Sequence, residues 1–434
     1  MKYAISSTIL LLILMLFGNG YTQQVISLDE AITLTLSNQP VIQQALAQVN
    51  AAEAKIDEQK SYYYPRVQSD LTFNRVGPVP AIEFLGYSFE LAPANNYNAN
   101  ISASQLVYDF GKRNAQMELT KQFKLTAQDK IELIKNNLTF QTIRVYYTIL
   151  FLHKSIDVSD EQISNLEKHL ELTRKKVASG SATDFDILTT QVKVATAQNQ
   201  KTDVENALRK QNLVLNSLMG KPSDFPLNLT GEFKVDSSAF DLESLLNNAY
   251  GNRLEIKLAQ DAEKNALATR QVASLSDRPN LGVMASYGFK NGYQPDLDEL
   301  VGNWVAGIHA SIPIFDGNLK SARVAEAEAN IKSSSEQIRE LKRSIKLEVE
   351  QAAADLEANR LKIKTSTVQV EHAKQAVSRA GNKYKDGVIT NLDLIDSETS
   401  LAQAKLMYLQ VEYENVLSYY NLQRATGSIL KVTQ

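Results

Sequence analysis

The 434-residue chain contains no cysteine, which excludes disulfide bonds, thiolate metal sites and a lipid-bearing N-terminal cysteine. Its four histidines show no ligand spacing of the HExxH kind. Positive charge is not in excess: 46 Lys and Arg face 49 Asp and Glu, and the net charge of −3 argues against a nucleic-acid partner. A nucleophile elbow and a phosphate-binding loop are also missing. We therefore expect no cofactor, no metal site and no catalytic residue, and we do not expect an enzyme.

Long apolar runs are missing too, apart from one near the N-terminus. Nine apolar residues, 9–17, follow Lys2, and small residues continue through Thr22. This run is too short for a membrane-spanning helix, which needs about 20 residues. The pattern predicts a secretory signal peptide over residues 1–22. We expect the mature protein to leave the cytoplasm without becoming a lipoprotein.

Glycine and proline are absent from two long stretches, residues 112–179 and 318–380. A short turn follows each, and then a second stretch without either residue, 181–219 and 388–426. A helix over 112–179 would reach roughly 100 Å, a length typical of coiled coils. Apolar residues at heptad-like steps favour this interpretation. In the first stretch they are Ile131, Leu138, Val145, Leu152, Ile156, Ile163, Leu166, Leu170 and Val177.

The two turns are one element repeated at an offset of 207 residues. A glycine suits the left-handed position just past the end of the incoming helix. A threonine and an acid three residues later form a capping box for the outgoing helix. The pattern predicts two hairpin tips between long helices. The matched pairs are Gly180 with Gly387, Thr183 with Thr390, Phe185 with Leu392, and Asp186 with Asp393.

Between the helices, apolar and polar residues alternate with a period of two, which is typical of β-strands. Four such segments occur, at 67–74, 97–104, 281–289 and 304–312. The apolar cluster at 84–89 either extends the first hairpin or shapes an external mouth. Tyr97 and Trp304 belong either to an aromatic membrane-interface belt or to ordinary packing.

The order of helix, hairpin, long helix, tip and helix occurs twice, which predicts an internal duplication. We expect the first repeat at 23–220, a connector at 221–240 and the second repeat at 241–434. Pro40 is expected to break the opening helix of the first repeat. The segment 241–278 is expected to form one helix of 38 residues.

Four amphipathic strands cannot close a barrel alone. Two chains would give 8 strands, with an interior filled by side chains, and three chains would give 12, enough for an aqueous lumen. The small, polar inner face favours three chains. Its residues include Asn98, Ser102, Ser104, Gly307 and Ser311.

The two tip sequences, at 177–188 and 384–400, and the strand-to-helix segment 312–317 resemble the TolC-type outer-membrane efflux factor family. The resemblance implies a mainly α fold with a small β part. It implies a homotrimeric α-helical barrel of coiled coils in the periplasm and a 12-stranded β-barrel, four strands per chain, in the lipid of the cell outer membrane. The tips would dock a periplasmic adaptor (membrane fusion protein) that joins an inner-membrane pump. The chain ends at Gln434, soon after Gly427, so an equatorial structure built from a long tail is not expected.

By the same resemblance, Asp393 and Asp396 would line a periplasmic gate. Threefold symmetry would stack two carboxylate rings, which select cations or hold divalent ions. The alternatives are that Asp393 caps its helix, as Asp186 does, and that Asp396 lies on a solvated face. The tip turn and adaptor docking are assigned to Gly180, Thr183, Asp186, Gly387, Thr390, Tyr384 and Leu392. Apolar residues beside the tips are either docking surface or coiled-coil core, namely Val177, Ala178, Tyr384, Val388 and Leu392.

The function expected from these features is export of substrates across the outer membrane, with energy supplied by a partner. The alternative is a secreted or surface structural coiled coil without a pore. That alternative explains the long helices but not four alternating strands at matched places in both halves.

Overall fold

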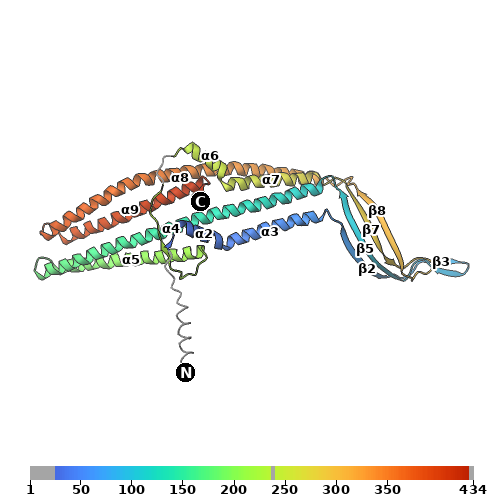
Figure 1. The fold of residues 1–434 in the computed structure, drawn as a ribbon, viewed down its shortest axis with the longest axis horizontal. Coiled ribbons are helices and arrows are strands. Elements are labelled where there is room, and N and C mark those ends of the chain that lie inside the picture. The colour runs from blue at the N-terminus through green and yellow to red at the C-terminus, as the bar shows by residue number, and fades with distance from the viewer. Residues whose placement is uncertain (1–24, 236–239, 430–434) are drawn as a thin grey trace, which may run out of the picture. The chain divides into compact units, whose positions relative to one another are not determined.

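The computed structural model describes residues 25–235 and 240–429 (Figure 1). The predicted signal peptide lies outside the described residues, as do 236–239 of the predicted connector. The chain forms two compact units, and each is built from separate segments. The helical unit contains residues up to Gln43, Glu132–Arg253 and the chain from Lys342 onward. The strand unit contains Gln44–Ile131 and Leu254–Leu341.

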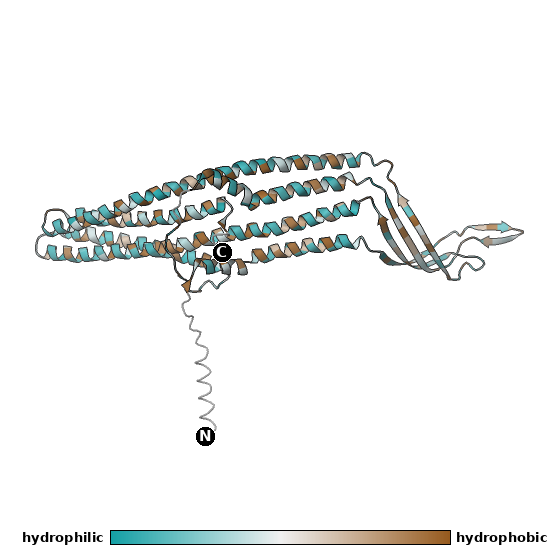
Figure 2. Ribbon diagram, turned by 45° about the horizontal axis from the view of Figure 1, so that its top comes forward, coloured by the Kyte–Doolittle hydropathy of each residue, from teal (hydrophilic) through white to brown (hydrophobic). Residues whose placement is uncertain are grey.

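Four long helices carry the two tips. The first tip joins α4 (Lys112–Ala178, 67 residues) to α5 (Asp184–Leu218, 35 residues). The second joins α8 (Leu319–Lys385, 67 residues) to α9 (Asn391–Ala425, 35 residues). The predicted long helices and tips are therefore confirmed, and α8 continues through Gly381 to reach the same length as α4. Figure 2 shows apolar and polar residues interspersed along these helices, as expected when one stripe packs and the rest is solvated.

The shorter helices come in two pairs. The first is α2 (Leu28–Asn38) and α3 (Pro40–Ser61), broken at Pro40 as predicted. The second is α6 (Leu242–Asn252) and α7 (Leu254–Ser274), so the prediction of one helix over 241–278 is wrong. Arg253 has an extended backbone, and its N–H donates to the Ala249 carbonyl as a C-cap.

A side chain at each break caps the C-terminal end of the helix that follows a tip, α5 at the first break and α9 at the second. The Gln39 amide donates to the carbonyls of Ser217 and Leu218 at 3.0 and 2.6 Å. The Arg253 guanidinium donates to the carbonyl of Ala425 at 3.2 Å. These carbonyls have no partner inside their own helix. The second break therefore follows from the position of α9 and needs no proline.

The main core of the helical unit forms where α2, α4, α5 and α9 pack together. Tyr146 is 1% exposed, and its hydroxyl donates to the carbonyl of Ile26 at 2.9 Å. Ile26 belongs to a two-residue strand, β1 (Val25–Ile26), which pairs in parallel with β6 (Asn228–Leu229). The connector after α5 is therefore held against the start of the first repeat. Other buried core residues are Ile143, Ile149, Leu215, Met219, Val416 and Ile429.

The strand unit contains a four-stranded antiparallel sheet in the order β2, β5, β7, β8. Its strands are β2 (Arg66–Arg75), β5 (Asn95–Tyr108), β7 (Asn280–Lys290) and β8 (Val301–Ser311). The predicted strands are confirmed: β2, β5 and β7 run somewhat beyond their alternating segments, and β8 begins before residue 304 and ends at Ser311, one residue short of its predicted end. A separate hairpin of β3 (Ala81–Phe84) and β4 (Tyr87–Glu90) lies between β2 and β5 in the chain (Figure 1).

Within residues 25–235 and 240–429, none of the helices is both long enough and apolar enough to cross a bilayer.

Candidate functional site

The two tips have the same backbone turn. Gly180 and Gly387 have φ of +73° and +76°, in the left-handed region where a side chain is strained. The N–H of the following residue reaches back to the helix in both, from Ser181 to the Lys176 carbonyl and from Val388 to the Lys383 carbonyl, each at 2.8 Å. This closure satisfies carbonyls at the end of the incoming helix.

Each outgoing helix starts with a threonine and an aspartate in mutual contact. Asp186 accepts from the N–H and hydroxyl of Thr183 at 2.9 and 2.8 Å. Asp393 accepts from the N–H and hydroxyl of Thr390 at 2.8 and 2.7 Å. These hydrogen bonds lower the pKa of Asp393. Capping geometry is thus present at both aspartates, and a role of Asp393 in a gate stays a prediction.

Asp396 lies one turn beyond Asp393 on α9 and is exposed. In the part of the chain that the structure describes, it has no hydrogen-bond or ion-pair partner. Residues three apart share a helix face, so the two carboxylates lie on one side of α9. The cap uses Asp393 and does not involve Asp396, whose role in a gate stays a prediction.

A buried polar network joins the tips, and sequence reasoning missed it. Asn391, the first residue of α9, is 6% exposed and contacts His169 Nε2 through its side-chain oxygen at 2.6 Å. Its amide nitrogen donates to the carbonyl of Asp186 and to the hydroxyl of Thr190, each at 3.3 Å. Burial lowers the pKa of His169, although the contact with Asn391 opposes the shift. The only sequence signal was a histidine on the inward side of α4.

The apolar residues beside the tips divide between core and surface. Tyr384 is 4% exposed and packs against His169, and Lys176 Nζ lies 4.0 Å from its ring centroid. Tyr384 therefore belongs to the coiled-coil core, which corrects its assignment to a docking surface. Val388 and Leu392 are 68% and 51% exposed, so they are available for docking.

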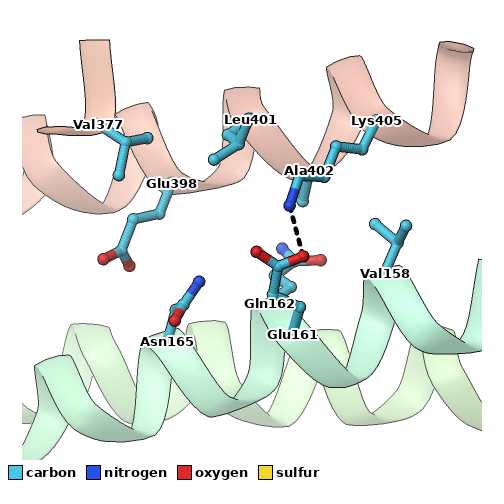
Figure 3. A pocket seen from close by; sticks show the side chains of 9 residues that line it. All are labelled: Val158, Glu161, Gln162, Asn165, Val377, Glu398, Leu401, Ala402 and Lys405. Carbon is cyan, nitrogen blue, oxygen red and sulfur yellow. Dashed lines mark hydrogen bonds and ion pairs between the residues drawn. The ribbon is translucent and has the colours of Figure 1, made fainter. Parts of the chain in front are cut away.

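A small cavity lies farther along α9, between it and α4 (Figure 3). Lys405 of α9 forms an ion pair with Glu161 of α4 at one side. Glu398 points into the same space, where its Oε2 is buried and has no hydrogen-bond partner among the described residues. Burial raises the pKa of Glu398 to about 7. The cavity thus contains a carboxyl that changes charge near neutral pH.

The four-stranded sheet has two unlike faces. The register places Phe73 opposite Tyr97, Ala99 opposite Phe289, and Tyr287 opposite Trp304, all on the apolar face. The other face carries small and polar residues such as Asn98, Asn100, Ser102, Ser104 and Gly307.

Aromatic residues gather at both ends of this sheet. Near the loop end, Trp304 is 74% exposed and Tyr287 59% exposed. Near the helix end are exposed Tyr62, Tyr63, Tyr64, Tyr108 and Phe110. Two aromatic bands flanking an apolar strip are the pattern of a membrane barrel wall. The belt position of Trp304 and Tyr97 stays a prediction, and the Tyr97 ring packs against Phe73 with 5.1 Å between the ring centroids.

A family model described as "Outer membrane efflux protein" matches residues 31–221 and 245–428. The chain belongs to the outer membrane efflux protein family. It is 23% identical over 418 residues to the outer membrane protein TolC of Escherichia coli, covering 91% of this chain and 80% of that protein. It is 21% identical over 342 residues to the alkaline protease secretion protein AprF of Pseudomonas aeruginosa, covering 77% of this chain and 70% of that one.

The fold agrees with the family. A crystal structure of CusC matches with a TM-score of 0.79 at 17% identity, covering 92% of each chain. This outer membrane efflux protein is therefore a channel of the cell outer membrane that exports substrates. The alternative of a structural coiled coil without a pore is not favoured. Its family is one of transport proteins and not of enzymes.

Proposed function

We propose that three copies of this efflux protein close into one channel, with an aqueous lumen lined by the polar face of the sheet. The observation that carries the proposal is the open sheet. Within the described residues, β2 and β8 are each paired on one side only. Unpaired strand edges are not tolerated in lipid, so each edge needs a partner strand. With an even number of strands, β8 of one copy meets β2 of the next in antiparallel orientation, and three copies give 12 strands.

The strand lengths support a membrane position for this wall. β7 and β8 contain 11 residues each. A tilted transmembrane strand needs about 9–11 residues. The apolar face would contact outer-membrane lipid and the two aromatic bands would lie at its interfaces.

We assign the gate to Asp393 and Asp396. In a trimer each residue would occur three times around the axis, and none of the residues that the structure describes forms an ion pair with Asp396. Rings of carboxylates attract cations and bind divalent ions. The role of Asp393 in the cap is compatible with this assignment, because one carboxylate can accept from Thr390 and still face the lumen.

We assign adaptor docking to the tip surfaces. Phe185, Leu188 and Val192 of α5 are 74%, 60% and 64% exposed, and Val388 and Leu392 add to this apolar surface from the second tip. Positions i, i+3 and i+7 lie along one helix face, which suits an amphipathic partner helix. The turns at Gly180, Thr183, Asp186, Gly387 and Thr390 would present these residues, and Tyr384 would support them from below.

The partners follow from relatives that act in export systems. AprF is named for secretion of a protease. By analogy, this chain would receive its substrate from an inner-membrane pump through a periplasmic adaptor. The repeat boundaries at 23–220 and 241–434, with 221–240 between them, form part of the same proposal.

The test is single-channel conductance of the purified protein in a planar bilayer, with and without a divalent cation. The wild type is compared with Asp393→Asn/Asp396→Asn, and Asp186→Asn at the first tip is the matched control. We expect a small cation-selective current that the divalent ion blocks, and a larger, unblocked current in the double variant. A current that is the same in the double variant as in the wild type would support the channel but contradict the gate. If a well-folded sample gives no current, the proposal of an open lumen is contradicted.

A further inference from the structure

The hairpin of β3 and β4 has one apolar face that none of the described residues covers. Its register pairs Ile82 with Phe89 and Phe84 with Tyr87, so these four side chains share a face. They are 53%, 54%, 64% and 71% exposed. Leu85 at the turn is 83% exposed and extends the patch. Five side chains of this size expose on the order of 500 Å² of apolar surface, comparable to the largest patch on a typical monomer.

The opposite face of the hairpin is polar and negatively charged. Glu83 lies across from Ser88, and Glu90 lies across from Ala81. The chain contains no Lys or Arg between Val76 and Gly111. A lipid surface that carries phosphate groups would repel such a segment, because the segment has no basic side chain to neutralise the phosphate charge.

Strand length also places the hairpin outside the hydrocarbon. All four strands connect to helices at one end of the sheet, and the hairpin follows the other end. β2 ends at Arg75 and β3 begins at Ala81, so five further residues separate the hairpin from a strand already as long as the membrane requires.

The base of the hairpin is held at the end of the sheet. The N–H of Val76 donates to the Ala94 carbonyl at 2.8 Å, and the N–H of Leu91 donates to the Pro80 carbonyl at 2.9 Å. The first bond continues the β2–β5 ladder toward the hairpin, and the second continues the β3–β4 ladder toward the sheet. An isolated two-stranded hairpin is marginally stable in water, so this one needs a partner for its apolar face.

We propose that the apolar faces of the β3–β4 hairpins from the three copies pack against one another and cover the external mouth of the channel. This inference rests on the proposed trimer. A second copy is the occupant that fits, because the ring of strands holds identical apolar faces around one mouth, and their acidic faces remain in water. The first hairpin would thus act as an external cap separate from the tips.

The absence of cysteine makes a crosslinking test direct. Phe84→Cys puts one thiol on the apolar face, and Glu83→Cys puts one on the polar face of the same strand. The purified full-length protein is treated with a short bismaleimide, and light scattering establishes its oligomeric state. We expect at least a fivefold higher yield of linked dimer from Phe84→Cys, because its thiols would converge.

Equal yields of linked dimer from the two variants in an intact trimer would overturn the cap, while the proposed trimeric channel would still hold. A sample without trimer would overturn the proposed function itself. A fluorescent, environment-sensitive label on Phe84→Cys distinguishes a neighbouring hairpin from lipid as the partner of the apolar face. Quenching of the label by brominated lipid would show that lipid covers the face, and would also overturn the cap. Protection of that label without lipid quenching, in the trimer alone, is the expected result.

Discussion

The tip at Gly180 and the tip at Gly387 use the same turn, yet the helices that leave them lie in different surroundings. The first residue of α5, Asp184, is exposed, whereas the first residue of α9, Asn391, is 6% exposed and bonded to α4 and α5. Five residues into each helix, Leu188 is 60% exposed and its counterpart Ile395 is fully buried. The repeated motif therefore determines the turn at each tip. The residues that pack around the turn determine that the second tip, through Asn391, forms the contacts that join the two tips.

The largest expected effect comes from removing the side chain that distinguishes the second tip. Asn391→Ala would leave His169 and Thr190 without their buried partner and should destabilise the tips by about 2–3 kcal/mol. Asp184→Ala, at the matched position of the first tip, should cost about 0.5 kcal/mol or less. Hydrogen exchange of the tip amides measures both. Similar losses from the two variants would mean that the network adds nothing.

The glycines should behave alike, because the turn is what the tips share. Gly180→Ala and Gly387→Ala meet no atom within 4 Å but force a side chain into the left-handed region, at a cost of about 1 kcal/mol each. Gly381→Ala is the control, since that glycine lies inside α8 and alanine there should stabilise by about 0.5–1 kcal/mol. Thermal unfolding of the detergent-solubilised protein gives the comparison. A marked difference between the two tip variants would show that the turns are not equivalent.

The caps should differ slightly. The Thr390 hydroxyl accepts from the Asp393 N–H at 3.2 Å, in addition to donating to the carboxylate. At the first tip the Asp186 N–H bonds to the Thr183 carbonyl instead. Thr390→Val should therefore cost about 1 kcal/mol and Thr183→Val about half of that. Local hydrogen exchange at the start of α5 and α9 would resolve the two, and a larger effect at Thr183 would contradict the assignment.

The last effect is seen only at high pH. Glu398 has its ordinary pKa of 4.5 in the unfolded chain and about 7 in the fold. Its proton therefore stabilises the folded protein fully below pH 4.5, and this stabilisation is lost as the pH rises through 7. Glu398→Gln stays neutral and should be more stable than the wild type at pH 8 by on the order of 1 kcal/mol, discounted for partial exposure.

The counterpart of Glu398 in the first half is Gln191, which is exposed. Gln191→Glu is therefore the matched control and should show no pH-dependent change in the thermal midpoint. If Glu398→Gln gives the same difference from the wild type at pH 5 and pH 8, the carboxyl does not titrate in the cavity.

Local patterns predicted the parts of the fold that depend on local physics. Glycine, threonine and aspartate at fixed spacing marked both tips, and alternation marked all four main strands. The break at Arg253 could not be predicted, because it results from α9 ending against α6 and not from a proline. The network around Asn391 joins residues more than 200 positions apart, so no window of sequence contains it.

Burial was the least predictable feature of the candidate site. Tyr384 and Val388 are four residues apart beside one turn, yet the first is 4% and the second 68% exposed. Both are apolar residues at positions compatible with core or surface, and only packing against α4 separates them. The cluster at 84–89 could also be predicted only in part. Its apolar character was evident from the sequence, but its pairing register as a separate hairpin was not.

The chain enters and leaves the four-stranded sheet at its helix end, and in the proposed barrel this arrangement would limit what must cross the bilayer during biogenesis. In the proposed barrel only two connections would pass the hydrocarbon, residues 76–94 and 291–300, and neither contains Lys or Arg. They carry five carboxylates, on Glu83, Glu90, Asp296, Asp298 and Glu299. In that barrel the electrostatic cost of insertion would come from these carboxylates together with Arg75 and Lys290, which lie at the loop ends of β2 and β7.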